Sequence, residues 1–238
     1  MAFQGFGFAS LVNSLTITFR YTLWEIVITI AGGLLLAALF NRESRAFSVM
    51  RSIVFMPRYI AISAAAVVFL WILNDEYGIL NYILTALGFK PIMFNTKENA
   101  LTAVLILTGW RVVGYGMMIY LSAMKGISPE YYEAAKLDGA NGFQQFRYIT
   151  LPLLSPTTLF LLVTTFIASM KVFQSIDVMT GGGPYGSTEV IVYWIYELAF
   201  VDFRVDRAAA VTLVFFIILM VVTAATMKFS ERNIYYES

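Results

Sequence analysis

The sequence contains no cysteine and no histidine, and these two absences remove several kinds of chemistry. Without cysteine there are no disulfide bonds and no thiolate metal sites. Without histidine the chain lacks the commonest general base and the commonest metal ligand. No hydrophobic stretch holds a pair of carboxylates either, so the sequence predicts no catalytic residue, no metal site and no cofactor in this chain.

Charge is also scarce. Only 13% of the 238 residues are charged and 59% are hydrophobic, whereas a soluble domain carries about 25% charged residues. This composition excludes a disordered, fibrous or ordinary soluble protein, and it indicates that lipid is the solvent for much of the surface. The net charge of +1 argues against nucleic acid as a partner. The phosphate-binding motif G-x-x-x-x-G-K-[ST] is absent, so the chain cannot bind ATP by that device.

The charged residues separate five long uncharged stretches, at 26–41, 59–74, 112–124, 148–170 and 208–227. A helix needs about 20 apolar residues to cross a bilayer, so the shorter stretches must include flanking residues. Arg20, Glu25 and Arg58 can snorkel to the interface. The predicted fold is therefore an all-α bundle of transmembrane helices, at about 12–40, 54–74, 100–124, 153–176 and 207–229.

Lysine and arginine in the connections predict the orientation of these spans. Nine of them lie in one set of connections, which is therefore cytoplasmic: Arg42, Arg45, Arg51, Arg58, Lys125, Lys136, Arg147, Lys228 and Arg232. The opposite set holds five: Arg20, Lys90, Lys97, Arg204 and Arg207. The connections 75–99 and 177–206 then face outside, and Gly78–Gly88 is expected to form a short interfacial helix. Five spans place the N-terminus outside, and Met1–Ser10 lacks the basic start of a signal peptide. Either the chain inserts with its N-terminus outside or a sixth, N-terminal span is missing, and we expect the missing span.

The cytoplasmic segment Gly126–Pro156 is predicted to form two short helices. Ser128 is a good N-cap and Pro129 suits the first position of a helix that runs to Leu137. Gly139 permits a tight reversal. The second helix is expected to begin after the cap Asn141, to run through Ile149 and to be stopped by Pro152. Phe143, Phe146 and Ile149 are expected to pack this pair internally, which makes a compact docking element.

Two motifs in this sequence match a known family. Glu133-Ala-Ala-x-x-Asp138-Gly139-Ala140, followed by Phe146, Ile149, Leu151-Pro152 and Pro156, closely resembles the coupling loop of bacterial ATP-binding-cassette importer permeases. Thr180-x-Gly-Gly-Pro184 with Thr188, together with Asn13-Ser-Leu, resembles the maltose-type sugar permeases, on the side of the maltose F subunit. The resemblance covers nearly the whole chain. It implies one importer transmembrane domain over residues 1–238, with a coupling loop at residues 126–156.

The resemblance also implies a function and a set of partners. The chain is expected to be a permease subunit that imports a carbohydrate, an oligosaccharide in the first instance. It is expected to work by alternating access in a bacterial or archaeal plasma or inner membrane. Its expected partners are a second similar permease subunit, two ATPase subunits that bind ATP and Mg²⁺, and an extracytoplasmic solute-binding protein. A non-transport membrane scaffold is the remaining alternative class, and it would have no need of an ATPase-docking loop.

The resemblance assigns residues to coupling with the ATPase and to solute binding. The coupling residues are Glu133, Ala134, Ala135, Asp138 and Gly139, with Glu133 as the charge expected to contact the ATPase. The solute-binding positions, carried over by spacing, are Thr108, Val112 and Tyr115 in the third span and Thr165, Ser169 and Val172 in the fourth. The side chains of both valines cannot form hydrogen bonds, so this pocket is not a copy of the solute pocket of the maltose permeases. Packing between helices is the structural alternative for the small hydroxyl residues.

Arg111 and Lys171 are cations inside predicted spans, where a charge is costly and marks a functional site by default. Together they could neutralise an anionic solute, such as glycerol phosphate or an acidic sugar. Alternatively each snorkels outward or pairs with Asp177 or Glu98. Lys171 lies toward the outer end of its span, which favours that second interpretation.

Overall fold

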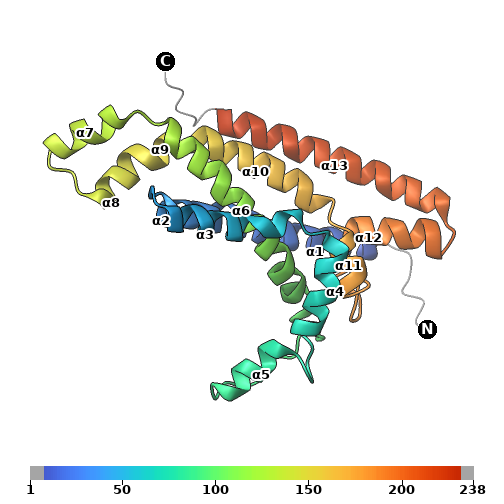
Figure 1. The fold of residues 1–238 in the computed structure, drawn as a ribbon. Coiled ribbons are helices and arrows are strands. Elements are labelled where there is room, and N and C mark those ends of the chain that lie inside the picture. The colour runs from blue at the N-terminus through green and yellow to red at the C-terminus, as the bar shows by residue number, and fades with distance from the viewer. Residues whose placement is uncertain (1–7, 232–238) are drawn as a thin grey trace. The chain divides into compact units, whose positions relative to one another are not determined.

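The computed structural model describes residues 8–231, and every regular element in that part of the chain is a helix (Figure 1). The all-α prediction is confirmed. The chain divides into two compact units, each of which is described by itself. The first consists of Met1–Glu25, Tyr59–Trp110 and Ile167–Met220, and the second of Ile26–Arg58, Arg111–Phe166 and Val221–Ser238.

Among the described residues, three helices are long and apolar enough to cross a membrane: Ala9–Phe40, Ala100–Gly126 and Val205–Lys228. Two bent helix pairs satisfy the same test, so the count reaches five if each pair is one span. The first span combines α1 (Phe8–Val27), the π turn η1 (Ile28–Gly32) and α2 (Gly33–Phe40). The third is α6 (Ala100–Gly126) and the fifth is α13 (Val205–Glu231). Each therefore corresponds to one predicted span, and the expected extra N-terminal span stays a prediction.

The second predicted span, 54–74, is not one straight helix. The chain forms α3 (Arg45–Phe55), the 3₁₀ turn η2 (Met56–Tyr59) and α4 (Ile62–Ile72), with a bend of 104° between the two parts. Pro57 has no backbone N–H to donate to the preceding turn, and Ala61 takes an extended ψ of 130° before α4. The uncharged run showed the apolar character of this segment but not its break.

The fourth predicted span, 153–176, is also bent, and its boundaries were wrong. The π turn η3 (Phe146–Thr150) and α9 (Leu151–Leu153) precede α10 (Ser155–Met170), with a bend of 60°. Pro152 does not stop the helix as predicted, because it lies inside α9 and the break comes at Leu154. The wider π turn before it relieves the clash that a proline ring makes with the preceding turn.

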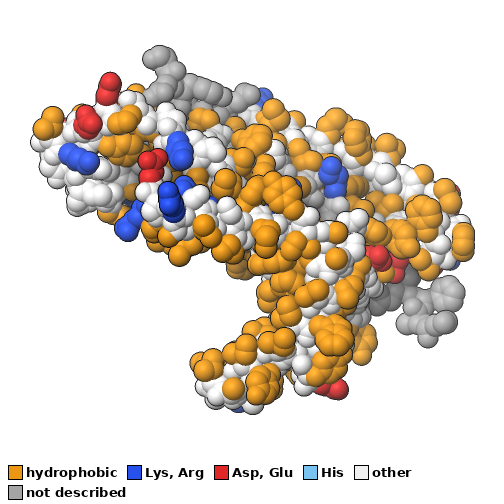
Figure 2. All heavy atoms as spheres, in the orientation of Figure 1, with side chains coloured by type: hydrophobic (Ala, Val, Ile, Leu, Met, Phe, Trp, Pro, Cys, Tyr) orange, Lys and Arg blue, Asp and Glu red, His pale blue; other side chains and the backbone are white. Residues whose placement is uncertain are grey.

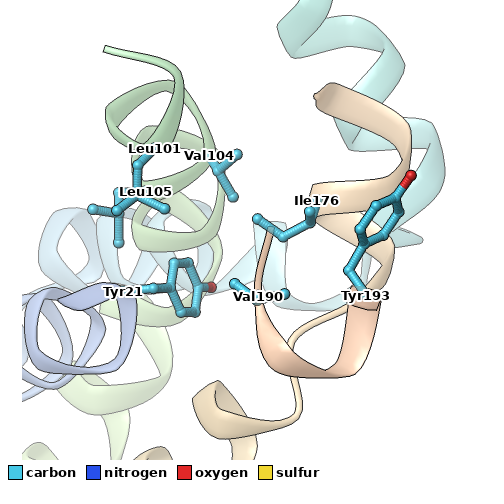
Figure 3. Packing of buried hydrophobic residues seen from close by; sticks show 7 residues of the cluster. All are labelled: Tyr21, Leu101, Val104, Leu105, Ile176, Val190 and Tyr193. Atoms are coloured by element: carbon cyan, nitrogen blue, oxygen red, sulfur yellow. The ribbon is translucent and has the colours of Figure 1, made fainter. Parts of the chain in front are cut away.

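The first unit has a core that joins segments far apart in the sequence (Figure 3). Tyr21 of α1 lies with Leu101, Val104 and Leu105 of α6, with Ile176 of α11 (Gln174–Met179), and with Val190 and Tyr193 beside and within α12 (Ile191–Tyr196). The backbone N–H of Ile191 also donates to the buried Thr18 hydroxyl at 2.9 Å. This bond satisfies one of the unpaired N–H groups at the start of α12.

The connection after α4 contains the expected short helix, α5 (Ile79–Ala86). The buried Asn81 side chain donates to the Ile92 carbonyl at 2.9 Å and accepts from the Ile92 N–H at 2.8 Å. The Asp75 carboxylate accepts from the N–H of Phe94 at 2.6 Å. The opposite face of α5 is apolar and exposed, with Tyr82 77% exposed, and hydrophobic side chains cover the region of α4 and α5 in Figure 2. An amphipathic helix of this kind suits a membrane interface.

The second unit is held together by close contact between backbones. Met117, Tyr120 and Leu121 of α6 form a core cluster with Ala37 of α2 and with Leu154 and Leu161. A Cβ atom at Gly116 would lie 2.3 Å from the carbonyl oxygen of Thr29, and one at Gly114 would lie 2.2 Å from that of Val54. Small residues at such positions let transmembrane helices approach closely.

The predicted orientation can be checked by labelling single cysteines, because the chain has no native cysteine. Phe143, in the segment predicted to be cytoplasmic, is 73% exposed, and Tyr185, in a connection predicted to lie outside, is 91% exposed. In intact cells, a membrane-impermeant maleimide is expected to label Tyr185→Cys and to leave Phe143→Cys unlabelled until the membrane is permeabilised. Labelling of Phe143→Cys from outside would reverse the assignment.

Candidate functional site

The predicted cytoplasmic hairpin forms as α7 (Pro129–Leu137) and α8 (Gly142–Gln145) (Figure 1). Ser128 caps α7 through its side chain, which accepts from the Glu130 N–H. Gly139 takes a φ of +79°, in the left-handed region where glycine has no steric penalty. Asn141 caps α8 in a reciprocal capping box with Gln144. The predicted caps and reversal are confirmed, although α8 ends at Gln145 and η3 follows it.

The hairpin presents its predicted coupling residues to solvent. Glu133, Ala134, Asp138 and Gly139 are exposed, and Ala135 is half-buried. Leu137 is 91% exposed and Phe143 is 73% exposed. The expectation that Phe143 packs inside the hairpin was wrong, because α8 is too short to bring its ring back over α7. Large apolar side chains next to an exposed carboxylate are typical of a protein-binding surface.

Polar and apolar contacts tie the hairpin to the rest of the second unit. The hydroxyl groups of Tyr132 and Thr150 lie 2.9 Å apart, which connects α7 to η3. Phe146 packs against the core cluster of Met117 and Tyr120. These contacts connect α7 to the start of the fourth span.

One predicted solute position in the first unit is used for a contact inside the protein. The Thr108 hydroxyl donates to the Glu25 carboxylate at 2.8 Å, and both residues are buried. Thr108 therefore offers a solute an acceptor oxygen more readily than a donor. The expectation that Glu25 snorkels to the interface was wrong, since its side chain is only 7% exposed. A carboxylate inside a membrane span is a candidate functional residue that the sequence reasoning missed, and its position within an otherwise apolar run was the available signal.

The fourth-span positions differ in their surroundings. Thr165 and Ser169 lie one turn apart on α10, and both are buried. Val172 lies beyond the end of α10 and packs against the core cluster of the first unit. Lys171, just after Met170, is exposed.

The third-span positions in the second unit are half-buried. The Arg58 guanidinium lies over the ring of Tyr115, 5.2 Å from its centroid. Arg111 places Nη2 3.5 Å from the carbonyl oxygen of Arg58, at the break between α3 and α4. Val112 belongs to the same unit as Tyr115 and Thr165, whereas Thr108, Ser169 and Val172 belong to the first unit.

The glycine-rich motif forms a tight loop in the first unit. Gly181 and Gly182 both have positive φ, and a Cβ at Gly182 would lie 2.7 Å from the ring of Tyr193. The fully buried Thr188 donates to the Thr180 hydroxyl at 2.7 Å, and Thr180 donates to the Ile176 carbonyl at 3.0 Å. The two threonines of the motif therefore hold the ends of the loop together.

Carboxyl groups follow this loop, and their proximity was not evident from the sequence. Burial raises the pKa of Glu189 to about 7, and the negative charge of Glu197 adds to the increase. Burial also raises the pKa of Glu197, with a further contribution from Asp202. In the part of the chain that the structure describes, no three acidic side chains are arranged to hold a metal ion.

The raised pKa of Glu189 predicts how the stability of the folded protein depends on pH. The folded state binds the Glu189 proton more tightly than the unfolded state, so stability falls as pH rises from about 4.5 to about 7. We expect Glu189→Gln to raise the melting temperature of the purified complex at about pH 8.5 but not at about pH 4.5. Because the carboxyl group is only partly buried, solvent screening reduces the gain to ~1 kcal/mol, or roughly 2–4 °C. The exposed Glu98→Gln is the control, and an equal gain at both pH values would contradict the prediction.

Comparison with known proteins agrees with this architecture. The chain is 32% identical over 228 residues to the sn-glycerol-3-phosphate transport system permease protein UgpA of Agrobacterium fabrum, covering 95% of this chain and 78% of the relative. It is 34% identical over 226 residues to the probable ABC transporter permease protein YurN of Bacillus subtilis, covering 93% and 77%. The expected class of importer permeases is confirmed, and the likeness to the maltose F subunit is approximate.

A solved structure supports the same assignment to the importer permeases. A chain of the bacterial alginate ABC transporter, in complex with its alginate pentasaccharide-bound periplasmic protein, matches with a TM-score of 0.85 and 25% identity, over 97% of this chain and 80% of the other. Residues 29–234 match the family described as binding-protein-dependent transport system inner membrane component. The chain therefore belongs to this family of ABC importer permeases and contains no ATPase of its own.

Proposed function

We propose that this permease imports a hydroxyl-rich solute, a carbohydrate in the first instance, across the bacterial inner membrane. The observation that carries the proposal is the pair of buried hydroxyl groups of Thr165 and Ser169 on one face of α10. Tyr115 adds an aromatic ring on α6. Sites for sugars combine a few polar groups with such a face. Val112 and Val172, the other two positions carried over in these helices, have no side-chain group that can form a hydrogen bond with a solute.

In this proposal the import cycle is driven by other subunits. An extracytoplasmic binding protein delivers the solute, and a second, similar permease completes the pathway. Two ATPase subunits bind ATP and Mg²⁺ and engage α7 through Glu133, Ala134, Ala135, Asp138 and Gly139. The exposed side chains of α7 and the Tyr132–Thr150 contact that connects α7 to η3 support this role.

An anionic solute is the second candidate, and specific observations favour it. Arg111 lies within α6. The solute named for one relative is sn-glycerol-3-phosphate and the solute named for the similar solved transporter is alginate, and both carry negative charge. In that case Arg111 and Lys171 would neutralise the solute. Against it, Arg111 contacts the Arg58 carbonyl, and Lys171 is exposed after the end of α10.

The two candidates make opposite forecasts for two variants. If hydroxyl groups bind the solute, Ser169→Leu is expected to lower uptake roughly tenfold or more, since loss of a buried hydrogen-bond partner costs ~1–3 kcal/mol and leucine adds bulk. Lys171→Gln is then expected to change uptake less than about twofold. Uptake of a neutral oligosaccharide and of sn-glycerol-3-phosphate is measured in proteoliposomes with the complete complex and its binding protein.

Ser169→Thr is the matched control, because it keeps the hydroxyl group and adds one methyl. Abolished uptake in Lys171→Gln, with near-normal uptake in Ser169→Leu, would reject the neutral carbohydrate and establish the anionic solute. Membrane levels of each variant are matched before the rates are compared.

A further inference from the structure

A cavity in the second unit shares no lining residue with the proposed solute positions. It has a volume of about 290 Å³ and lies between α3 and the C-terminal half of α6. Its lining residues are Ser48, Arg51, Ser52, Phe55, Met118, Leu121, Ser122 and Lys125. In each helix the lining positions repeat at intervals of three, four and seven residues, so one face of α3 meets one face of α6.

The charged groups that line this cavity are all positive. It contains two cations and three hydroxyl groups, and none of its lining residues is acidic. Phe55, Met118 and Leu121 form its apolar part. The cavity is therefore amphipathic, with positive charge and hydrogen-bond donors next to hydrocarbon.

One of the cations is held in place by its own helix. Arg51 donates from Nε to the Phe47 carbonyl at 3.2 Å, which restrains the guanidinium group against α3. This bond uses one of the five N–H donors of the guanidinium group. A restrained arginine loses less side-chain entropy when it binds an anion, which favours recognition over a mobile surface charge.

We propose that this cavity binds the phosphate group of a phosphate ester. Two cations beside the Ser48 and Ser122 hydroxyl groups supply several donors, which suits the two or three non-bridging oxygens of a phosphate group. The third hydroxyl group, that of Ser52, already donates to the Ser48 carbonyl at 3.1 Å. The ester can be the headgroup of an anionic phospholipid or a soluble phosphorylated molecule, and the chemistry of the cavity is common to both. Lys125, at the end of α6, and α3 belong to the side predicted to be cytoplasmic, where both sources occur.

The test uses the complete complex in nanodiscs and a variant that removes both cations, Arg51→Gln with Lys125→Gln. Native mass spectrometry measures bound phosphatidylglycerol, and titration calorimetry measures binding of sn-glycerol-3-phosphate in the absence of the solute-binding protein. We expect the wild-type complex to bind one of these probes, and the double variant to bind it at least roughly tenfold more weakly.

The matched control is Arg42→Gln with Arg45→Gln, which removes the same charge from the side predicted to be cytoplasmic but outside the cavity. It is expected to change the affinity less than about twofold. A second variant, Ser48→Ala with Ser122→Ala, keeps both charges and is expected to give an intermediate loss, which separates recognition from misfolding.

The outcomes separate the two sources. Retention of phosphatidylglycerol alone assigns the cavity to a lipid headgroup, and binding of glycerol phosphate alone assigns it to a soluble ester. Equal losses in the cavity variant and in the control would overturn the proposal, because general surface charge would then explain the binding. Absence of binding by the wild-type complex to both probes would overturn it as well.

Discussion

The Glu133→Lys variant is expected to assemble and insert normally and to lose at least roughly nine-tenths of its solute-stimulated ATP hydrolysis. Glu133 is exposed on α7 next to Ala134. If it contacts the ATPase as proposed, charge reversal presents a cation to a surface that would pair with an anion. Truncation of one partner of a close charge pair at an interface costs ~2–5 kcal/mol, and reversal adds repulsion. ATP hydrolysis by the complete complex, with and without loaded binding protein, measures the effect.

Glu130→Lys is the matched control for this experiment. It makes the same change of charge on the same exposed helix, one turn nearer the N-terminus and outside the coupling motif. Its stimulated hydrolysis is expected to stay within about threefold of the wild type. Unchanged stimulation in Glu133→Lys would show that this carboxylate has no part in coupling.

Gly116→Val is expected to prevent formation of a stable permease. A Cβ atom at this position would lie 2.3 Å from the Thr29 carbonyl oxygen, and Gly33 approaches the same stretch, with a Cβ distance of 2.8 Å to the Gly116 backbone. Backbone atoms cannot move aside as a flexible side chain can, so α6 and the first span must separate. The cost exceeds the ~1–3 kcal/mol of ordinary overpacking and is comparable with the stability of a whole domain.

Gly126→Val tests whether this effect comes from close packing. Gly126 is in the last turn of the same helix, and a Cβ there has no neighbour within 4 Å. Membrane abundance and the melting temperature of the solubilised complex are expected to remain near wild type for Gly126→Val and to collapse for Gly116→Val. A Gly116→Val complex that melts at the wild-type temperature would contradict the helix contact described for the second unit.

The sequence by itself determined the class of the protein, the approximate positions of the spans and the local design of the cytoplasmic hairpin. Long uncharged runs predict membrane helices because burial of a charge in lipid is costly wherever the helix packs. Ser128, Gly139 and Asn141 act on neighbouring backbone groups, so their roles follow from nearby residues alone.

The tertiary structure alone decided which polar groups are buried and where the backbones meet. From the sequence alone, Glu25 is predicted to lie at the membrane interface. The structure instead places it beside Thr108, 83 residues later in the chain. The close approaches at Gly114 and Gly116 and the cavity between α3 and α6 likewise depend on segments that no local pattern brings together. A residue's surroundings in these places are set by packing between distant helices, which periodicity and charge along one helix do not specify.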